Sequence, residues 1–268
     1  MIPATVEHVR PATLDQALEA LANPEAKALA GGQSLLPVMK LRIVRPSVLV
    51  DIGRLELHGM QLGEGELRLG ALTTWDEVES APELERPPFA AIAECAGEIG
   101  DLQVRNRGTL GGSLAHADPA SDMPAVALAL GAHLVLRAAS AERTLSAAEL
   151  FLGPFTTALG PGELIIEVVF PLVEGSGSAY AKVEHPASGF ALAGAAAHVT
   201  ADGRQRVAVP GIGVHPFLLA ADADPLDALA EAEIYGDRFA PAAYRQHIAG
   251  VVVRRALDRA RERMEKAR

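Results

Sequence analysis

The chain has few of the features that mark several common classes of protein. Its 268 residues include one cysteine, Cys95, which excludes an internal disulfide and any iron–sulfur cluster ligated by cysteines of this chain alone. No apolar run approaches the roughly 20 residues that a membrane-spanning helix needs, and no charged-then-apolar N-terminal signal is present. We therefore expect a cytoplasmic protein in which Cys95 is a small buried hydrophobic residue.

Aromatic residues and clustered positive charge are also scarce. Aromatic residues make up 4% of a chain that is 49% hydrophobic, which predicts a globular core built from small aliphatic side chains. The formal net charge of −10 argues against a nucleic-acid partner, because binding to a phosphate backbone needs a basic surface. The arginines near the C-terminus alternate with acidic residues, which is typical of a solvated or partner-facing helix.

Two glycine pairs are the most informative features that the chain does contain. The first lies in Ala30-Gly31-Gly32-Gln33-Ser34, and the second lies in Thr109-Leu110-Gly111-Gly112-Ser113. Without Cβ atoms, such a backbone can take positive φ and lie against a ligand, with its N–H groups directed at phosphate oxygens. Each pair alone is equally consistent with a tight turn. Together they predict a cradle for a dinucleotide diphosphate.

The known alternatives to such a cradle have no support in the sequence. Neither glycine pair reads G-x-G-x-x-G with an acidic residue at the ribose spacing, and no Walker pattern occurs, so the sequence argues against a Rossmann or P-loop site. The G-x-S-x-G and H-E-x-x-H signatures are absent as well. His116, Asp118 and Asp122 could be read as metal ligands. However, Pro119 favours a rigid turn, with Asp118 as a turn former, over a metal site.

Three segments carry a family resemblance: AGGQSLLPVMKLR from Ala30, RNRGTLGGSLAHADPASDMPA from Arg105, and Tyr180-Ala181-Lys182 together with Phe190-Ala191-Leu192. They resemble the FAD-binding medium subunit of the molybdenum hydroxylases, the family of carbon monoxide dehydrogenase and xanthine dehydrogenase. The resemblance implies an α+β fold of the vanillyl-alcohol-oxidase and molybdenum-hydroxylase type, not a Rossmann fold. In that fold, two subdomains hold FAD and are followed by a C-terminal domain with a three-stranded antiparallel sheet and helices.

The resemblance also implies a set of residues that bind FAD. Backbone groups of the two glycine segments would bind the diphosphate, and Asp122 would bind ribityl or ribose hydroxyls. The set consists of Ala30, Gly31, Gly32, Gln33, Ser34, Leu35, Thr109, Gly111, Gly112, Ser113, Ala115, His116, Ser121, Asp122 and Lys182. No residue of this chain is expected to be catalytic or to ligate a metal.

Lys182 and Phe190 have two interpretations each. By resemblance, Lys182 would lie near the flavin, where a cation favours the reduced ring. A solvent-facing lysine on an alternating strand is equally consistent with the sequence. Phe190 could cover a face of the ring, but the pattern favours an ordinary core phenylalanine. Tyr244-Arg245, near the start of the last helix, is expected to cap or pack.

The pattern of apolar residues and breakers predicts the order of the elements. Thr13 is expected to cap a first helix that ends at Asn23-Pro24. A small β-α-β-like unit should surround the first glycine segment, and the second segment should form a loop. The expected strands are 27–30, 48–52, 67–71, 133–138, 163–170, 180–184, 190–200 and 206–214, and the expected helices are 35–41, 73–79, 88–99, 226–232 and 241–263.

A Gly/Ser break at 174–178 divides the predicted domains. The FAD-binding domain is expected at 1–173, with subdomains of about 1–57 and 58–173, and the C-terminal domain at 179–268. The leading hypothesis is an electron-transfer subunit. It would take electrons through FAD from a small iron–sulfur subunit with two 2Fe–2S clusters, beside a large molybdopterin subunit, in a dimer of heterotrimers. A self-sufficient flavin oxidoreductase and a ligand-binding or assembly module without redox chemistry remain alternatives.

Overall fold

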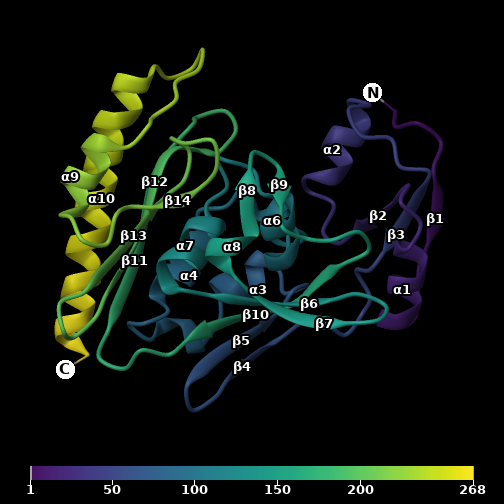
Figure 1. Cartoon of the computed structure of the whole chain (residues 1–268), viewed down its shortest axis with the longest axis horizontal. Helices are drawn as coiled ribbons and strands as arrows, with labels where there is room; N and C mark the ends of the chain where they lie inside the picture. Colours follow the sequence, from purple (N-terminus) through teal and green to yellow (C-terminus); the bar gives the residue numbers. More distant parts are fainter. Residues whose placement is uncertain (1, 268) are drawn as a thin grey trace.

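The computed structural model describes residues 2–267, so the outermost bounds of the predicted domains, residues 1 and 268, lie outside it. The chain begins with a small unit at the right of Figure 1, in which three parallel strands lie in the order β1-β3-β2. The elements are β1 (Glu7–Val9), α1 (Leu14–Leu21), β2 (Ala26–Leu29), α2 (Leu35–Lys40) and β3 (Val48–Asp51). Thr13 caps α1 by accepting a hydrogen bond from the Gln16 N–H, which confirms the predicted helix start.

The central part is a five-stranded antiparallel sheet with helices packed on it, in the strand order β4-β5-β10-β6-β7. Its strands are β4 (Met60–Leu62), β5 (Glu66–Gly70), β6 (His133–Arg137), β7 (Glu142–Ser146) and β10 (Leu164–Pro171). The other elements are α3 (Trp75–Glu79), η1 (Pro82–Glu85), α4 (Ala90–Gly97), α5 (Leu102–Arg105), α6 (Leu110–His116), α7 (Met123–Leu130), α8 (Ala147–Leu150), β8 (Phe151–Gly153) and β9 (Thr156–Thr157).

The C-terminal part is an antiparallel sheet with helices α9 and α10 on one face, seen at the left of Figure 1. Its elements are β11 (Gly177–Glu184), β12 (Ala191–Val199), β13 (Gln205–Val209), β14 (Phe217–Leu218), α9 (Pro225–Glu231) and α10 (Ala242–Lys266). The prediction of three strands is wrong. The strand expected at 206–214 ends at Val209, and the chain then returns so that β14 pairs with β13 as a fourth strand.

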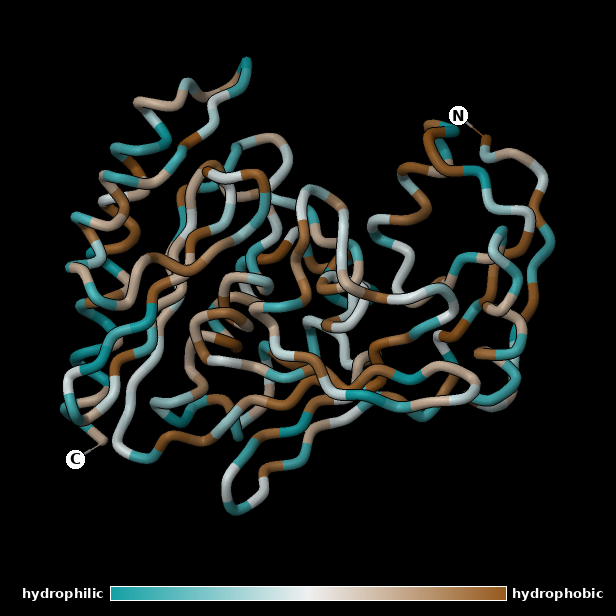
Figure 2. The backbone as a smooth tube through the Cα atoms, viewed as in Figure 1, coloured by the Kyte–Doolittle hydropathy of each residue, from teal (hydrophilic) through white to brown (hydrophobic). Residues whose placement is uncertain are grey.

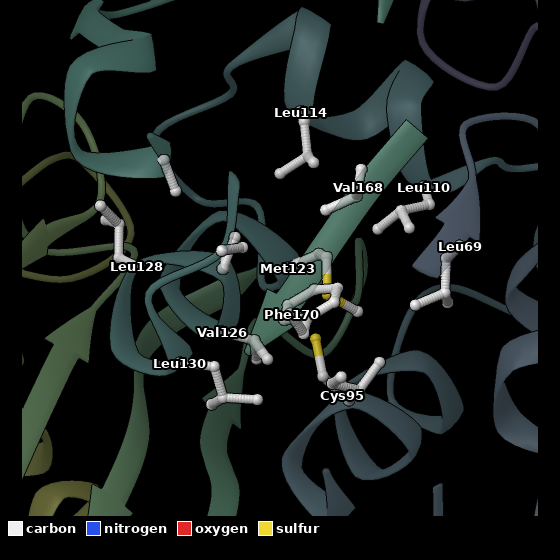
Figure 3. Close-up of a cluster of buried hydrophobic side chains, with 14 of the residues drawn as sticks. Leu69, Cys95, Leu110, Leu114, Met123, Val126, Leu128, Leu130, Val168 and Phe170 are labelled. Atoms are coloured by element: carbon white, nitrogen blue, oxygen red, sulfur yellow. The ribbon is translucent and has the colours of Figure 1, made fainter. Parts of the chain in front are cut away.

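Two faces of the C-terminal sheet are buried in two different cores. One face packs against α10, through Ala179, Ala195 and other small side chains. On the opposite face, Tyr180 belongs to the large central core that also contains α4, α6 and α7. Hydrophobic stretches run through this middle region in Figure 2, and Figure 3 shows the Cys95 sulfur directed toward Met123 and Phe170. The predicted burial of Cys95 is confirmed.

None of the helices between residues 2 and 267 is both long and apolar enough to cross a membrane.

A buried histidine makes the stability of this fold dependent on pH. His198, on β12, is 5% exposed and lies 2.9 Å from the Ser176 hydroxyl. Burial, assisted by the charge of Arg206, lowers the pKa of His198 from 6.5 to about 4. Between pH 6.5 and pH 4, His198 is therefore protonated in the unfolded chain but neutral in the folded chain. The stability that neutral His198 contributes is complete above the unfolded pKa and is lost as pH falls toward 4.

We expect the free energy of unfolding to fall by up to about 3 kcal/mol through His198 between pH 7 and pH 4. Chemical denaturation at several pH values measures this fall. A His198→Gln variant should show a smaller fall over the same range, because the glutamine side chain does not titrate. An equal fall in both proteins would show that His198 does not contribute.

Candidate functional site

The first glycine segment is a turn between β2 and α2 whose backbone donors are unused. Gly32 has a φ of 77°, which turns the chain out of the strand, and α2 then begins at Leu35. Within the described residues 2–267, the N–H groups of residues 31–35 have no acceptor in the chain. Five successive donors therefore lie in one short segment. Unused backbone donors in such a segment are an anion-binding arrangement.

The second glycine segment is not a loop, so that prediction is wrong. It forms the first turn of α6, which Thr109 caps by accepting a hydrogen bond from the Gly112 N–H. The N–H groups at the start of the helix are occupied by acceptors within the chain. Leu110 donates to Thr73 O, Gly111 donates to Ala71 O, and Ser113 donates to Thr109 O. The hydroxyl proton of Thr109 stays available, because the oxygen acts only as an acceptor in the cap.

The fold brings the two glycine pairs together, although about eighty positions separate them in the sequence. A Cβ atom added to Gly31 would lie 1.8 Å from the carbonyl oxygen of Arg107, so only glycine allows this approach of the two backbones. A Cβ on Gly112 would lie 3.8 Å from the Cβ of Ala30 and 2.7 Å from the hydroxyl oxygen of Thr109. The absence of side chains thus places the unused donors directly beside the start of α6.

The turn after α6 organises the remaining polar groups of the predicted site. The Ser113 and Ser121 hydroxyls are 2.9 Å apart, which joins α6 to the end of the turn. Asp118 accepts a hydrogen bond from the Ala120 N–H, which confirms its predicted role as a turn former. The His116 ring instead contacts the Phe155 ring in a tilted arrangement, with ring centroids 5.2 Å apart.

These placements bear on the metal interpretation of His116, Asp118 and Asp122. Each of the three side chains has its own partner elsewhere in the chain, and they do not converge on one point. Between residues 2 and 267, no group of three or more histidine, cysteine, aspartate or glutamate residues could hold a metal ion.

Asp122 and Lys182 meet in a buried cluster together with Tyr180, which the sequence had not indicated as a site residue. The Tyr180 hydroxyl donates to Asp122 Oδ1 at 2.5 Å, and Lys182 Nζ lies 3.2 Å from Asp122 Oδ2. Burial raises the pKa of the Asp122 carboxyl, and the nearby Lys182 charge opposes that rise. Burial also raises the pKa of Tyr180 well above its usual value, so the hydroxyl stays protonated and donates.

The structure excludes one of the two interpretations of Lys182 and one of the two interpretations of Phe190. The Lys182 side chain is only 2% exposed, so its interpretation as a solvent-facing lysine is wrong. Phe190 is 46% exposed, so its interpretation as a core residue is wrong too. Tyr180 and Lys182 are two residues apart on one strand and therefore share a face, which is the signal that could have added Tyr180 to the predicted site.

Comparison with known proteins identifies the family. The family model for the FAD binding domain in molybdopterin dehydrogenase matches residues 4–173. The chain belongs to this family. Its cofactor is FAD, and it is the flavoprotein component of an oxidoreductase of the molybdopterin dehydrogenase type. The diphosphate of that cofactor fits the first glycine segment. Five N–H donors are unused there, at residues 31–35, and the backbone at Gly31 leaves no room for a Cβ atom.

Relatives of this FAD-binding family are similar to the chain over four fifths of its length or more. The carbon monoxide dehydrogenase medium chain of Hydrogenophaga pseudoflava is 36% identical to this chain, and the alignment covers 97% of this chain and 98% of the relative. The glyceraldehyde dehydrogenase medium chain of Sulfolobus acidocaldarius is 38% identical over 81% of this chain and 79% of its own.

Solved structures agree with this family assignment. The structure of carbon monoxide dehydrogenase from Hydrogenophaga pseudoflava matches with a TM-score of 0.91 at 35% identity, covering 98% of this chain and 99% of that one. The structure of quinoline 2-oxidoreductase from Pseudomonas putida 86 matches with a TM-score of 0.90 at 28% identity, covering 98% and 100%. The C-terminal part is therefore included in the likeness, beyond the end of the family model.

Proposed function

We propose that this chain takes electrons from the iron–sulfur clusters of a partner subunit and passes them through FAD to a final acceptor. The observation that carries the proposal is the run of five unused N–H donors at residues 31–35, packed beside the start of α6. When bound, FAD supplies an isoalloxazine ring that exchanges electrons singly or in pairs. The chain's own task is to hold and orient the cofactor.

The donors of the first glycine segment would bind the diphosphate of FAD. The hydroxyls of Ser34, Thr109 and Ser113 would add hydrogen bonds, and the bare backbone of the second glycine pair would let the cofactor approach α6. This proposal assigns the FAD cradle to Ala30, Gly31, Gly32, Gln33, Ser34, Leu35, Thr109, Gly111, Gly112, Ser113, Ala115, His116 and Ser121.

The metal centres of the complex would belong to other subunits. Cys95 is the one cysteine of the sequence and is buried, so the chain has no set of thiolates for an iron–sulfur cluster. We propose a small subunit with two 2Fe–2S clusters and a large molybdopterin subunit as partners, assembled as a dimer of heterotrimers. One relative, from Paenarthrobacter nicotinovorans, is named as the alpha subunit of the 6-hydroxypseudooxynicotine dehydrogenase complex, which is consistent with such an assembly.

Purification under native conditions tests the proposal. We expect the tagged chain to show flavin absorption bands and to bring down two further subunits, one containing iron and sulfide and one containing molybdenum. Visible spectra, metal analysis and mass spectrometry measure the three properties. A colourless chain that rejects added FAD would contradict cofactor binding. A chain that turns over a substrate without any partner would favour a self-sufficient oxidoreductase.

A further inference from the structure

The ammonium group of Lys182 has no hydrogen-bond donor left for a ligand. Its Nζ atom lies 2.6 Å from the carbonyl oxygen of Glu98, 2.8 Å from that of Gly189 and 3.2 Å from Asp122 Oδ2. An ammonium carries three protons, and three acceptors surround this one. Because the side chain is 2% exposed, water does not compete for these protons. Lys182 is therefore fully engaged with its own chain.

The three acceptors belong to three separate parts of the fold. Glu98 directly follows α4, Asp122 directly precedes α7, and Gly189 lies in the loop of residues 185–190 that joins β11 to β12. Three backbone hydrogen bonds of this loop are internal: His185 N–H donates to Phe190 O at 2.8 Å, and the N–H groups of Ser188 and Gly189 donate to His185 O at 3.2 and 2.9 Å. Lys182 thus ties the loop to the body of the FAD-binding part.

Hydrogen bonds also connect the 185–190 loop to the second glycine segment through the turn after α6. Ala191, directly after the loop, donates its N–H to the Ala120 carbonyl at 3.4 Å. Ser121, the next residue along the turn, contacts Ser113 of α6. A displacement of the 185–190 loop would therefore be transmitted to the turn that closes one side of the proposed FAD cradle.

We propose that Lys182, which Asp122 and Tyr180 hold in place, is a latch that positions the 185–190 loop against the turn at the proposed FAD cradle, and that Lys182 itself does not touch the cofactor. This inference rests on the proposed FAD site and replaces a direct electrostatic role of Lys182 at the flavin ring. A buried ion pair suits this task, because its partners are satisfied in only one arrangement of the three elements. Phe190, which follows Gly189, is placed at the surface by the same latch.

The test compares three variants of the full chain: Lys182→Met, Tyr180→Phe and Glu184→Gln. The first removes the ammonium, and the second removes only the hydroxyl that holds Asp122. The third is the matched control, because the Glu184 carboxylate is 59% exposed and lies 4.0 Å from Lys182 Nζ. Three quantities are measured: amide hydrogen exchange at residues 185–191, the Kd for added FAD, and the ratio of reduced to oxidised flavin at a fixed ambient potential.

For Lys182→Met we expect exchange of the loop amides to accelerate by about tenfold and FAD binding to weaken by about tenfold, because a buried carboxylate loses its cation. Tyr180→Phe should change both quantities in the same direction by about threefold, the size expected for one hydrogen bond. The flavin ratio should stay within about twofold of wild type in both variants, and Glu184→Gln should match wild type throughout.

Two results would overturn the latch. A change of about tenfold in the flavin ratio of Lys182→Met alone would show direct action on the ring. Unchanged loop exchange in both variants would show that the loop does not depend on the cluster. If Lys182→Met does not fold, the loop exchange and the FAD Kd of Tyr180→Phe decide whether the latch exists. If the wild-type chain takes up no FAD, the proposed function fails, whereas loop exchange in the cofactor-free chain still tests the latch.

Discussion

Replacing Gly31 with alanine will weaken FAD binding by about 100-fold or more, because the first glycine segment and α6 can no longer meet. The new Cβ would lie 1.8 Å from the carbonyl oxygen of Arg107 and 2.7 Å from its carbonyl carbon. Both atoms belong to the main chain, so no side-chain rotation relieves the overlap. The segment must move away, and its five donors move with it.

Gly112 and Gly65 provide the comparisons for this prediction. A Cβ on Gly112 meets a side-chain atom, the Thr109 hydroxyl oxygen at 2.7 Å, so Gly112→Ala should weaken binding less than Gly31→Ala. A Cβ on Gly65 meets nothing within 4 Å, so Gly65→Ala should bind FAD as wild type does. Fluorescence titration with FAD ranks the three proteins, and circular dichroism checks that each is folded. Wild-type affinity in Gly31→Ala would exclude the first glycine segment as the site of the diphosphate.

Replacing Arg245 with methionine will destabilise the C-terminal part by about 3 kcal/mol or more, because several buried acceptors lose one shared donor. The Arg245 side chain is 9% exposed and pairs with Asp237 at 2.7 Å. It also donates to the carbonyl oxygens of Leu192, Gly211 and Ala240. The prediction that this residue caps or packs understated its role, since it joins α10 to β12 and to two loops.

Arg254 is the matched control, because it lies on the same helix and is exposed. Arg254→Met should change the free energy of unfolding by no more than about 0.5 kcal/mol. Urea denaturation followed by circular dichroism compares the two variants with wild type. Equal stabilities of Arg245→Met and Arg254→Met would mean that the buried hydrogen bonds of Arg245 have no net effect.

Local signals in the sequence predicted four of the five regular elements of the first unit, all except β1 (Glu7–Val9). The Thr13 cap, the strand before Gly31 and the helical turn after Ser34 all depend on neighbouring residues, and each was confirmed. The helix α7 was missed although it had readable limits, with Pro124 in its first turn and Gly131, at a φ of 69°, at its end.

The site required information that no local pattern contains. Alternation along β11 shows that Tyr180 and Lys182 share a face, but not that α4 and α7 cover that face. The donors of the two glycine pairs look equivalent in the sequence. Only the fold shows that the second set is occupied by acceptors such as Ala71 O, while the first set is unused. Contacts between distant segments therefore decide which residues face a ligand.

The hydrophobic core that the C-terminal sheet shares with the helices of the FAD-binding part determines the smallest fragment of this protein that can fold by itself. Tyr180, Ala196 and Ala208 belong to the same packed interior as the helix α7, whose residues are all buried. A fragment cut after residue 173 would expose one side of that helix to water. The stretch that carries the family signature is thus shorter than the autonomous folding unit, and an engineered flavin module taken from this protein has to retain the whole C-terminal sheet.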